Sequence, residues 1–130
     1  MEINDVIVLN VESKSNQITI LKESDPLLRR FGQCDLINLE SGESIEIWRQ
    51  QADEVWFVFE ELASFELVDL RENSPSFEVQ QTFILRAETP QVILIPFGVS
   101  CRISTDISLG SRLVRLTTHQ DGTLPGDKTP

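Results

Sequence analysis

Basic residues are scarce in this sequence. Lys and Arg number 11 against 21 Asp and Glu in 130 residues, which gives a net charge of −10. Because nucleic acids and anionic membranes bind positive surfaces, this balance argues against both as general partners. Long apolar runs are also lacking: no segment approaches the roughly 20 residues of a membrane-spanning helix, and the amino terminus lacks the basic start of a signal peptide. We therefore expect a cytoplasmic protein.

Residues with reactive side chains are few. The chain has no tyrosine, two cysteines and one histidine, His119, which we expect to be exposed at the start of a tail. In the cytoplasm Cys34 and Cys101 should both be reduced. No histidine lies near Cys101 in sequence, and we expect its surroundings in the folded protein to be acidic or apolar, which raises the pKa of a thiol. We interpret Cys101 as a buried, inert thiol in preference to a nucleophile.

The remaining composition is that of a soluble globular domain, with 40% hydrophobic and 25% charged residues. Residues 1–118 are predicted to form one domain that is large enough to bury its own core. Residues 119–130 contain two glycines, two prolines and no apolar periodicity, so we expect a flexible tail there.

Short apolar segments with period two, separated by turn residues, dominate the domain. Residues 42–70 read as three strands joined by turns, because apolar, β-branched and aromatic residues alternate with polar ones. Residues 22–31 predict a short helix or an irregular loop. Further strands are expected at residues 6–11, 17–21, 34–39, 77–85, 91–95, 99–104 and 111–118. The pattern predicts an all-β sandwich or barrel with at most one short helix.

The central stretch has two faces if its alternation is unbroken. The predicted cavity face combines large aromatic side chains with carboxylates and an amide. Its members are Glu46, Trp48, Gln50, Glu54 and Trp56. A solvated face would more often carry Lys, Ser and Thr, so we interpret this set as the wall of a semi-enclosed cavity.

The opposite face is then predicted to point outward, and it is purely apolar. Its members are Ile45, Ile47, Val55, Phe57 and Phe59. An exposed apolar set of this size is an association site unless another part of the chain covers it. We expect a homodimer through this face, with cover by the amino-terminal strands as the alternative.

The spacing of several of these residues resembles the two motifs of the cupin superfamily. Gly42, Trp48, Gln50, Glu54 and Glu61 keep the spacing of the first motif, although its two histidines and its final glycine are replaced. Pro96, Gly98 and Cys101 keep the spacing of the second motif, with cysteine in place of histidine. The resemblance implies a cupin-type double-stranded β-helix, or jelly-roll barrel, and a homodimer.

A narrower resemblance covers residues 68–106. The phrases Asp69-Leu70-Arg71 and Ser74-Pro75-Ser76-Phe77 are similar to the dTDP-4-dehydrorhamnose 3,5-epimerase (RmlC-like) group and to the related sugar ketoisomerases. For Arg71 itself we favour an ion pair with Asp69 or Glu72 over a phosphate contact. Arg112 and Arg115 are expected to project to opposite faces of one strand, and so not to form an anion clamp.

This chain lacks several of the residues that perform the chemistry of the families it resembles. The cupin metal-ligand positions are occupied by Trp48, Gln50, Glu54 and Cys101, which are not a ligand set for a divalent ion, so we predict no metal and no cofactor. At the epimerase positions, Trp48 replaces the catalytic histidine, Glu54 replaces the lysine, and there is no tyrosine. Asp106 matches the family's aspartate.

Two functions remain open. In the first, the protein is a metal-free cupin that binds a sugar or nucleotide-sugar in a binding, sensing or scaffold role. The predicted ligand-binding residues are Trp48, Gln50, Glu54, Trp56 and Cys101. In the second, it is a sugar-nucleotide isomerase or epimerase in which Glu46 and Glu54 replace the missing acid and base. The first is favoured, because acidic residues near the pocket disfavour a doubly negative diphosphate, and because Glu46 and Glu54 are better explained as solvated or hydrogen-bonded carboxylates.

Overall fold

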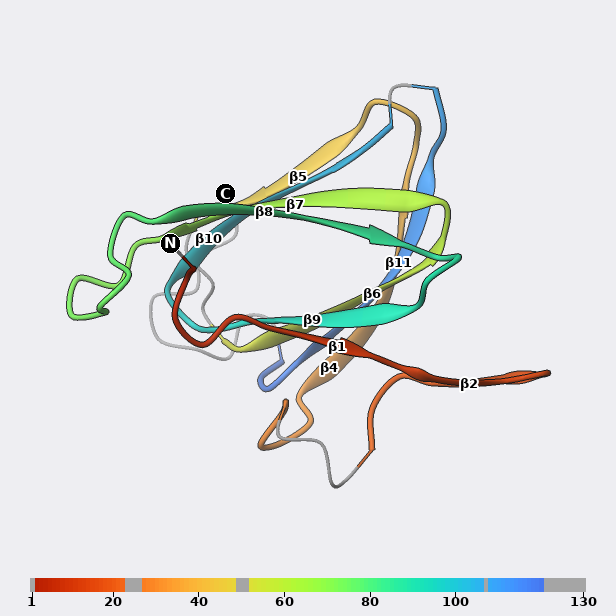
Figure 1. Ribbon diagram of the computed structural model, residues 1–130, viewed down its shortest axis with the longest axis horizontal. Coiled ribbons are helices and arrows are strands. Elements are labelled where there is room, and N and C mark those ends of the chain that lie inside the picture. The colour runs from red at the N-terminus through yellow and green to blue at the C-terminus, as the bar shows by residue number, and fades with distance from the viewer. Residues whose placement is uncertain (1, 23–26, 49–51, 107, 121–130) are drawn as a thin grey trace.

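Strands account for nearly all the regular structure in a computed structural model of the chain (Figure 1), which describes residues 2–22, 27–48, 52–106 and 108–120. The strands in these ranges are β1 (Ile7–Asn10), β2 (Glu12–Lys14), β3 (Gln17–Thr19), β4 (Gln33–Leu39), β5 (Ser44–Ile47), β6 (Glu54–Glu60), β7 (Leu62–Asp69), β8 (Gln80–Arg86), β9 (Gln91–Ile95), β10 (Val99–Thr105) and β11 (Ser111–Thr117). The described residues contain no helix, so none of them could cross a membrane as a helix. The helix considered at residues 22–31 is absent from their described part, and residues 23–26 lie outside it.

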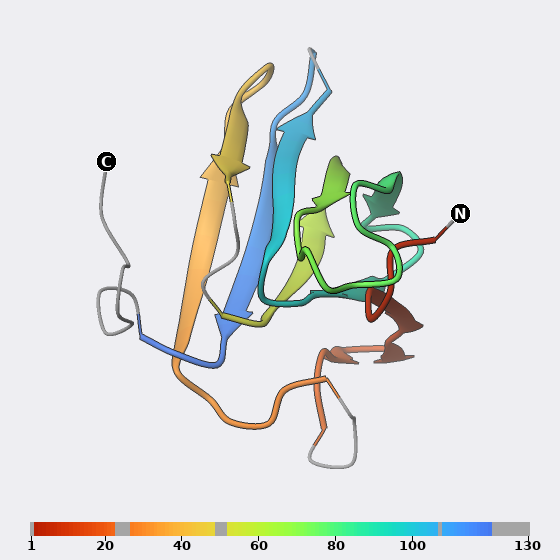
Figure 2. The same cartoon turned by 90° about the vertical axis from the view of Figure 1, so that its left-hand side faces the viewer.

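Two antiparallel sheets face each other and form the jelly roll (Figure 2). The five-stranded sheet has the order β1-β9-β6-β11-β4, and the four-stranded sheet has the order β5-β10-β7-β8. A separate β2-β3 hairpin extends from the body in Figure 1. The sequence-based expectation of an all-β cupin-type barrel is confirmed.

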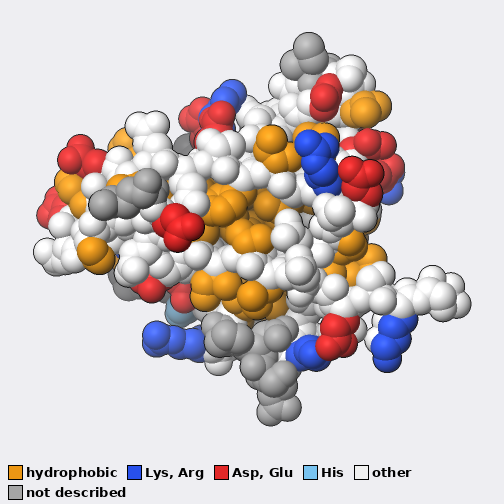
Figure 3. Space-filling view, in the orientation of Figure 1, with side chains coloured by type: hydrophobic (Ala, Val, Ile, Leu, Met, Phe, Trp, Pro, Cys, Tyr) orange, Lys and Arg blue, Asp and Glu red, His pale blue; other side chains and the backbone are white. Residues whose placement is uncertain are grey.

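The main core lies between the two sheets, where the inward-facing residues of each strand meet. Trp56 on β6 and Phe65 on β7 pack edge to face, with ring centroids 6.1 Å apart and an interplanar angle of 67°. Both side chains are fully buried, and each buried aromatic or aliphatic side chain contributes roughly 1.5–3 kcal/mol. In Figure 3, hydrophobic side chains show between the sheets and charged ones lie around them.

A second apolar cluster covers the outer face of the five-stranded sheet. Val55 and Phe57 on β6 are buried there against Leu27, and the amino-terminal residues Ile7 and Leu9 pack against the same cluster. The chain itself therefore covers most of the face that the sequence assigned to a homodimer. Among Val55, Phe57 and Phe59, only Phe59 is exposed.

The predicted face was wrong for Ile45 and Ile47. Both side chains pack against the main core, whereas Val55 and Phe57 point outward. Odd-numbered residues face the core in β5 and even-numbered residues face it in β6. The alternation therefore does not continue from β5 into β6. A prediction that assumes an unbroken alternation assigns the residues of β5 to the wrong face.

Candidate functional site

Several strand ends converge at one end of the barrel, here called the mouth. β5 ends at Ile47 and β6 begins at Glu54; β9 ends at Ile95 and β10 begins at Val99. Because these strands run antiparallel, their connections meet at the same edge of the sandwich. The residues that the sequence singled out for chemistry lie in or beside these connections.

A chain of polar contacts lies beside the apolar core, below the mouth. Arg115 on β11 donates from Nη2 to Glu54 Oε2 at 2.6 Å and from Nη1 to Asp35 Oδ2 at 3.2 Å. Trp56 Nε1 donates to Glu54 Oε1 at 3.0 Å. The registers of β4, β11 and β6 place these residues on neighbouring strands. Glu54 is 3% exposed, so its charge is neutralised inside the protein by Arg115.

The predicted cavity wall is not formed as a unit. Trp56 and Cys101 are 1% and 2% exposed and belong to the packed core. Burial raises the pKa of the Cys101 thiol, and the charges of Glu54 and Glu66 raise it further. Cys101 is thus an inert thiol at the second-motif position. Cys34 is also a free thiol, exposed on β4.

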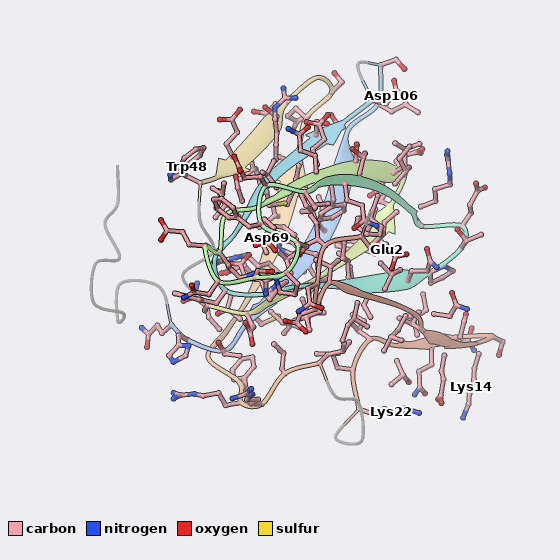
Figure 4. All side chains as sticks on the ribbon, turned by 60° about the vertical axis from the view of Figure 1, so that its left-hand side comes forward. Glu2, Lys14, Lys22, Trp48, Asp69 and Asp106 are labelled. Atoms are coloured by element: carbon pink, nitrogen blue, oxygen red, sulfur yellow. The ribbon has the colours of Figure 1, made fainter. Side chains whose placement is uncertain are left out.

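Glu46 and Trp48 point away from the barrel interior. Trp48 is 76% exposed, and Figure 4 shows it at the end of β5, directed outward. Arg102 Nε lies 3.4 Å from Glu46 Oε1 on the outer face of the four-stranded sheet. The prediction that Glu46 and Glu54 line one wall as an acid–base pair is therefore wrong. Gln50 lies outside the described residues.

A cleft of about 490 Å³ opens at the mouth, at a place that the sequence did not indicate. It is lined by Arg29, Arg30, Ala52, Asp53, Phe97, Thr118 and His119. The Phe97 ring is 58% exposed, and its backbone N–H donates to Asp53 Oδ1 at 2.8 Å, which fixes the loop between β9 and β10. Neither Arg29 nor Arg30 forms an ion pair within the described part of the chain.

Close backbone packing places the two arginines beside the histidine. Gly32 N–H donates to the Thr117 carbonyl at 2.7 Å, and a Cβ at Gly32 would lie 2.3 Å from His119 N. Only glycine allows this approach. The Thr118 hydroxyl lies 2.9 Å from His119 Nδ1. Since the lining segments are far apart in sequence, only the Arg29-Arg30 doublet in an acidic chain could have indicated a cationic cleft.

A buried carboxylate stabilises the loop on the other side of the mouth. Asp69 accepts hydrogen bonds from Arg71 Nε at 2.8 Å and from the hydroxyls of Ser74 and Ser76, each at 2.6 Å. Burial alone would raise the pKa of Asp69, but these hydrogen bonds outweigh it and hold the pKa below its usual range. The ion pair raises the pKa of Arg71. The prediction that Arg71 pairs with Asp69 is confirmed.

One predicted position lies at the other end of the barrel. Asp106 is exposed beyond the opposite end of β10, where Figure 4 places it far from Asp69, so it does not reach the mouth. No group of three or more His, Cys, Asp or Glu side chains suited to a metal ion occurs among the described residues.

Comparison with known proteins identifies the fold. No protein-family model and no curated protein matches the chain. A dTDP sugar isomerase from Desulfovibrio desulfuricans G20 matches with a TM-score of 0.83 at 14% identity, over 98% of this chain and 85% of that one. The dTDP-4-dehydrorhamnose 3,5-epimerase from Bacillus anthracis, with TDP and PPi bound, gives 0.78 at 19% identity, over 92% and 76% of the two chains.

An epimerase from Legionella pneumophila, in complex with dTDP-4-keto-L-rhamnose, matches with a TM-score of 0.75 at 17% identity, over 92% of this chain and 69% of that one. At these identities the likeness concerns the fold. The chain has the RmlC-like cupin jelly roll that these sugar-nucleotide epimerases and isomerases share.

Proposed function

We propose that this protein binds a nucleotide-sugar or a related sugar at the mouth cleft and does not epimerise it, acting in the cytoplasm in a binding, sensing or scaffold role. The observation that carries the proposal is the combination of two arginines and an exposed phenylalanine in one cleft of a chain with net charge −10. Guanidinium groups suit a diphosphate, and an open aromatic ring suits a nucleobase or a sugar face. The similar solved structures hold TDP with PPi and dTDP-4-keto-L-rhamnose.

The interior chemistry supports binding without turnover. A general base must be able to take a proton from the substrate. Glu54 instead accepts from Arg115 and from Trp56, and it is buried. At the position where the resemblance implies a lysine that stabilises an enolate, this carboxylate would repel the developing negative charge.

The five predicted ligand-binding residues do not all have the same role in this proposal. Trp48 is an exposed aromatic side chain next to the mouth and remains a proposed platform for a sugar, together with Gln50. Glu54, Trp56 and Cys101 are buried, so in this proposal they do not touch the ligand.

Calorimetric titration with dTDP-glucose, dTDP and free glucose tests the proposal. Arg30→Gln and Phe97→Ala should each weaken dTDP-glucose binding about tenfold or more, because a charge-assisted hydrogen bond or a base stack contributes about 1–3 kcal/mol. Arg86→Gln is the matched control, since Arg86 is an exposed arginine at the opposite end of the barrel. Equal affinity in all three variants would place the ligand elsewhere, and no heat from any ligand would reject the proposal.

A sugar-nucleotide isomerase or epimerase is the second candidate. The fold of the similar enzymes favours it, and so does the position of His119, the chain's single histidine, in the cleft beside Asp53. In this case His119, in place of Glu46 and Glu54, would be the residue that exchanges a proton with the substrate. Loss of activity in His119→Ala, with binding retained, would support this candidate. We also propose that the protein is a homodimer.

A further inference from the structure

Residues 3–5, here called the latch, lie against both sheets without forming a strand of either. They precede β1, an edge strand of the five-stranded sheet, and they contact β8, an edge strand of the four-stranded sheet. In Figure 2 the red β1 and the dark green β8 lie on the same side of the molecule. The Ile3 side chain is 3% exposed and belongs to the main core. The latch therefore closes the core on the side where β1 and β8 are the margins.

Side chains of β8 and of the loop before it hold the latch by its backbone. The Asn4 N–H donates to Ser76 Oγ at 2.7 Å, and the Asn4 carbonyl accepts from Arg71 Nη2 at 2.6 Å. The Ile3 N–H donates to Gln81 Oε1 at 2.9 Å. Among the described residues, no backbone-to-backbone hydrogen bond joins the latch to a strand. Its polar attachment therefore depends on side chains.

Asp69 orients both of the groups that hold Asn4. Its carboxylate accepts from Arg71 Nε at 2.8 Å and from Arg71 Nη2 at 2.9 Å. It also accepts from the Ser76 hydroxyl at 2.6 Å, which leaves the Ser76 oxygen able to accept the Asn4 N–H. Asp69 is completely buried and does not touch the latch itself. The groups that receive the latch are therefore fixed by the body of the protein.

Few contacts oppose the opening of the latch. Ile3 is its single buried side chain, whereas Asn4 and Asp5 are exposed. Asp5 has a φ of 70°, in the left-handed region that is unfavourable for a residue with a Cβ. Segments with few buried contacts open locally, at free energies below that of global unfolding. The latch has these properties, and the strands behind it do not.

The stem of Arg71 lies against the loop between β9 and β10. A Cβ at Gly98 would lie 2.6 Å from Arg71 Cγ and 3.3 Å from Arg71 Cδ. The preceding residue of this loop is Phe97, whose ring lines the mouth cleft. One side chain therefore contacts the latch with its guanidinium group and the mouth loop with its stem.

We propose that the latch opens while both sheets stay folded, and that Arg71 couples this opening to the mouth loop. When the latch is closed, Asn4 and Asp5 hold the guanidinium group and so keep the stem against Gly98. When it is open, the stem can move and the loop that carries Phe97 loses this support. The latch thus regulates the shape of the mouth. It does so with or without a ligand, so the inference stands or falls separately from the proposed function.

Thiol labelling of the full chain measures the opening. Ile3→Cys is combined with Cys34→Ser, so that the introduced thiol and Cys101 are the two targets of N-ethylmaleimide, and mass spectrometry follows each of them. Cys101 lies in the same core but on β10, so its labelling reports opening of the sheets. The introduced thiol should react about tenfold faster than Cys101 or more, because only the latch has to open.

Matched substitutions on β8 test how the latch is held. Gln81→Ala removes the partner of the Ile3 N–H and should speed labelling of the introduced thiol about tenfold. Gln80→Ala is the control, because Gln80 is an exposed residue of the same strand and should leave that rate unchanged.

Matched glycines test the coupling to the mouth. Gly98→Ala should speed labelling of the introduced thiol severalfold, since the new Cβ displaces Arg71. Gly42→Ala introduces alanine at a positive φ in open space, so it should speed labelling of Cys101 alone. Equal effects of Gly98→Ala and Gly42→Ala on the introduced thiol would overturn the coupling. Equal rates for the two thiols, or labelling of the introduced thiol as fast as in guanidinium chloride, would overturn the latch.

Discussion

Arg115 Nη2 lies 2.6 Å from Glu54 Oε2 inside the barrel, where the carboxylate is almost completely buried. Glu54 keeps the cupin spacing relative to Gly42, but its surroundings make it one half of an ion pair. Glu54 and Arg115 therefore neutralise each other's charge inside the barrel.

Replacing Arg115 should destabilise the protein strongly. In Arg115→Met, Glu54 would remain buried without its cation, and breaking one partner of a buried pair costs about 3–5 kcal/mol. Urea unfolding monitored by circular dichroism measures this change. Arg112→Met, on the same strand, is the control. Arg112 pairs with Glu60 at 3.0 Å, but both side chains are more than half exposed, so the loss should be within about 1 kcal/mol. Similar losses in both variants would contradict a special role for the interior pair.

Asp69→Asn should lose stability in a pH-dependent manner. Because folding lowers the pKa of Asp69 from its ordinary value of 3.8, the ionised carboxylate stabilises the folded state above that pH. This stabilisation is fully present above about pH 5 and is lost as the pH falls below about 4. The difference in unfolding free energy between the parent and Asp69→Asn should therefore be constant near neutrality and shrink in acid. A difference that is the same at about pH 6 and pH 3 would contradict the ion pair's contribution.

Gly98→Ala should destabilise the mouth more than Gly42→Ala. Both glycines have a positive φ, 90° at Gly98 and 78° at Gly42, so alanine is strained at either position by about 1 kcal/mol. At Gly98 the new Cβ would also lie 2.6 Å from Arg71 Cγ, whereas nothing lies within 4 Å at Gly42. Thermal unfolding of the two variants measures the difference. Equal midpoints would show that Arg71 moves aside at no cost.

The two thiols should differ in reactivity. Cys34 is exposed, whereas Cys101 is buried and its thiol pKa is raised by burial and by Glu54 and Glu66. Titration of the native protein with Ellman's reagent at neutral pH should modify one thiol per chain quickly, and the second only after unfolding in guanidinium chloride. Rapid modification of Cys101 in the native state would contradict the packed core.

Much of the fold was predictable because strand signals are local. The expected strand at residues 91–95 coincides with β9 (Gln91–Ile95), and the expected strand at 34–39 lacks only the first residue of β4. The ion pair of Asp69 with Arg71 was predictable for the same reason, since the two residues share one turn. Which side chains of β5 face the core could not be predicted. The alternation does not continue from β5 into β6, and no residue type in the flanking sequence indicates this.

The candidate site depended on contacts between distant segments. Arg29, Arg30 and His119 line the same cleft because the backbone of Gly32 contacts that of Thr117. A local sequence pattern cannot indicate a contact between segments so far apart in the chain. Arg115 was correctly expected to face away from Arg112. Its partners Glu54 and Asp35 could be identified only from the strand order.

Solvent deuterium exchange tests the central claim most directly. The protein would be incubated with a dTDP-4-keto-6-deoxy sugar in D₂O, with binding followed by calorimetry and the carbon-bound protons next to the ketone followed by NMR. Binding without deuterium incorporation beyond the protein-free rate is the predicted result. Rapid incorporation that disappears in His119→Ala would contradict it and would establish an isomerase or epimerase.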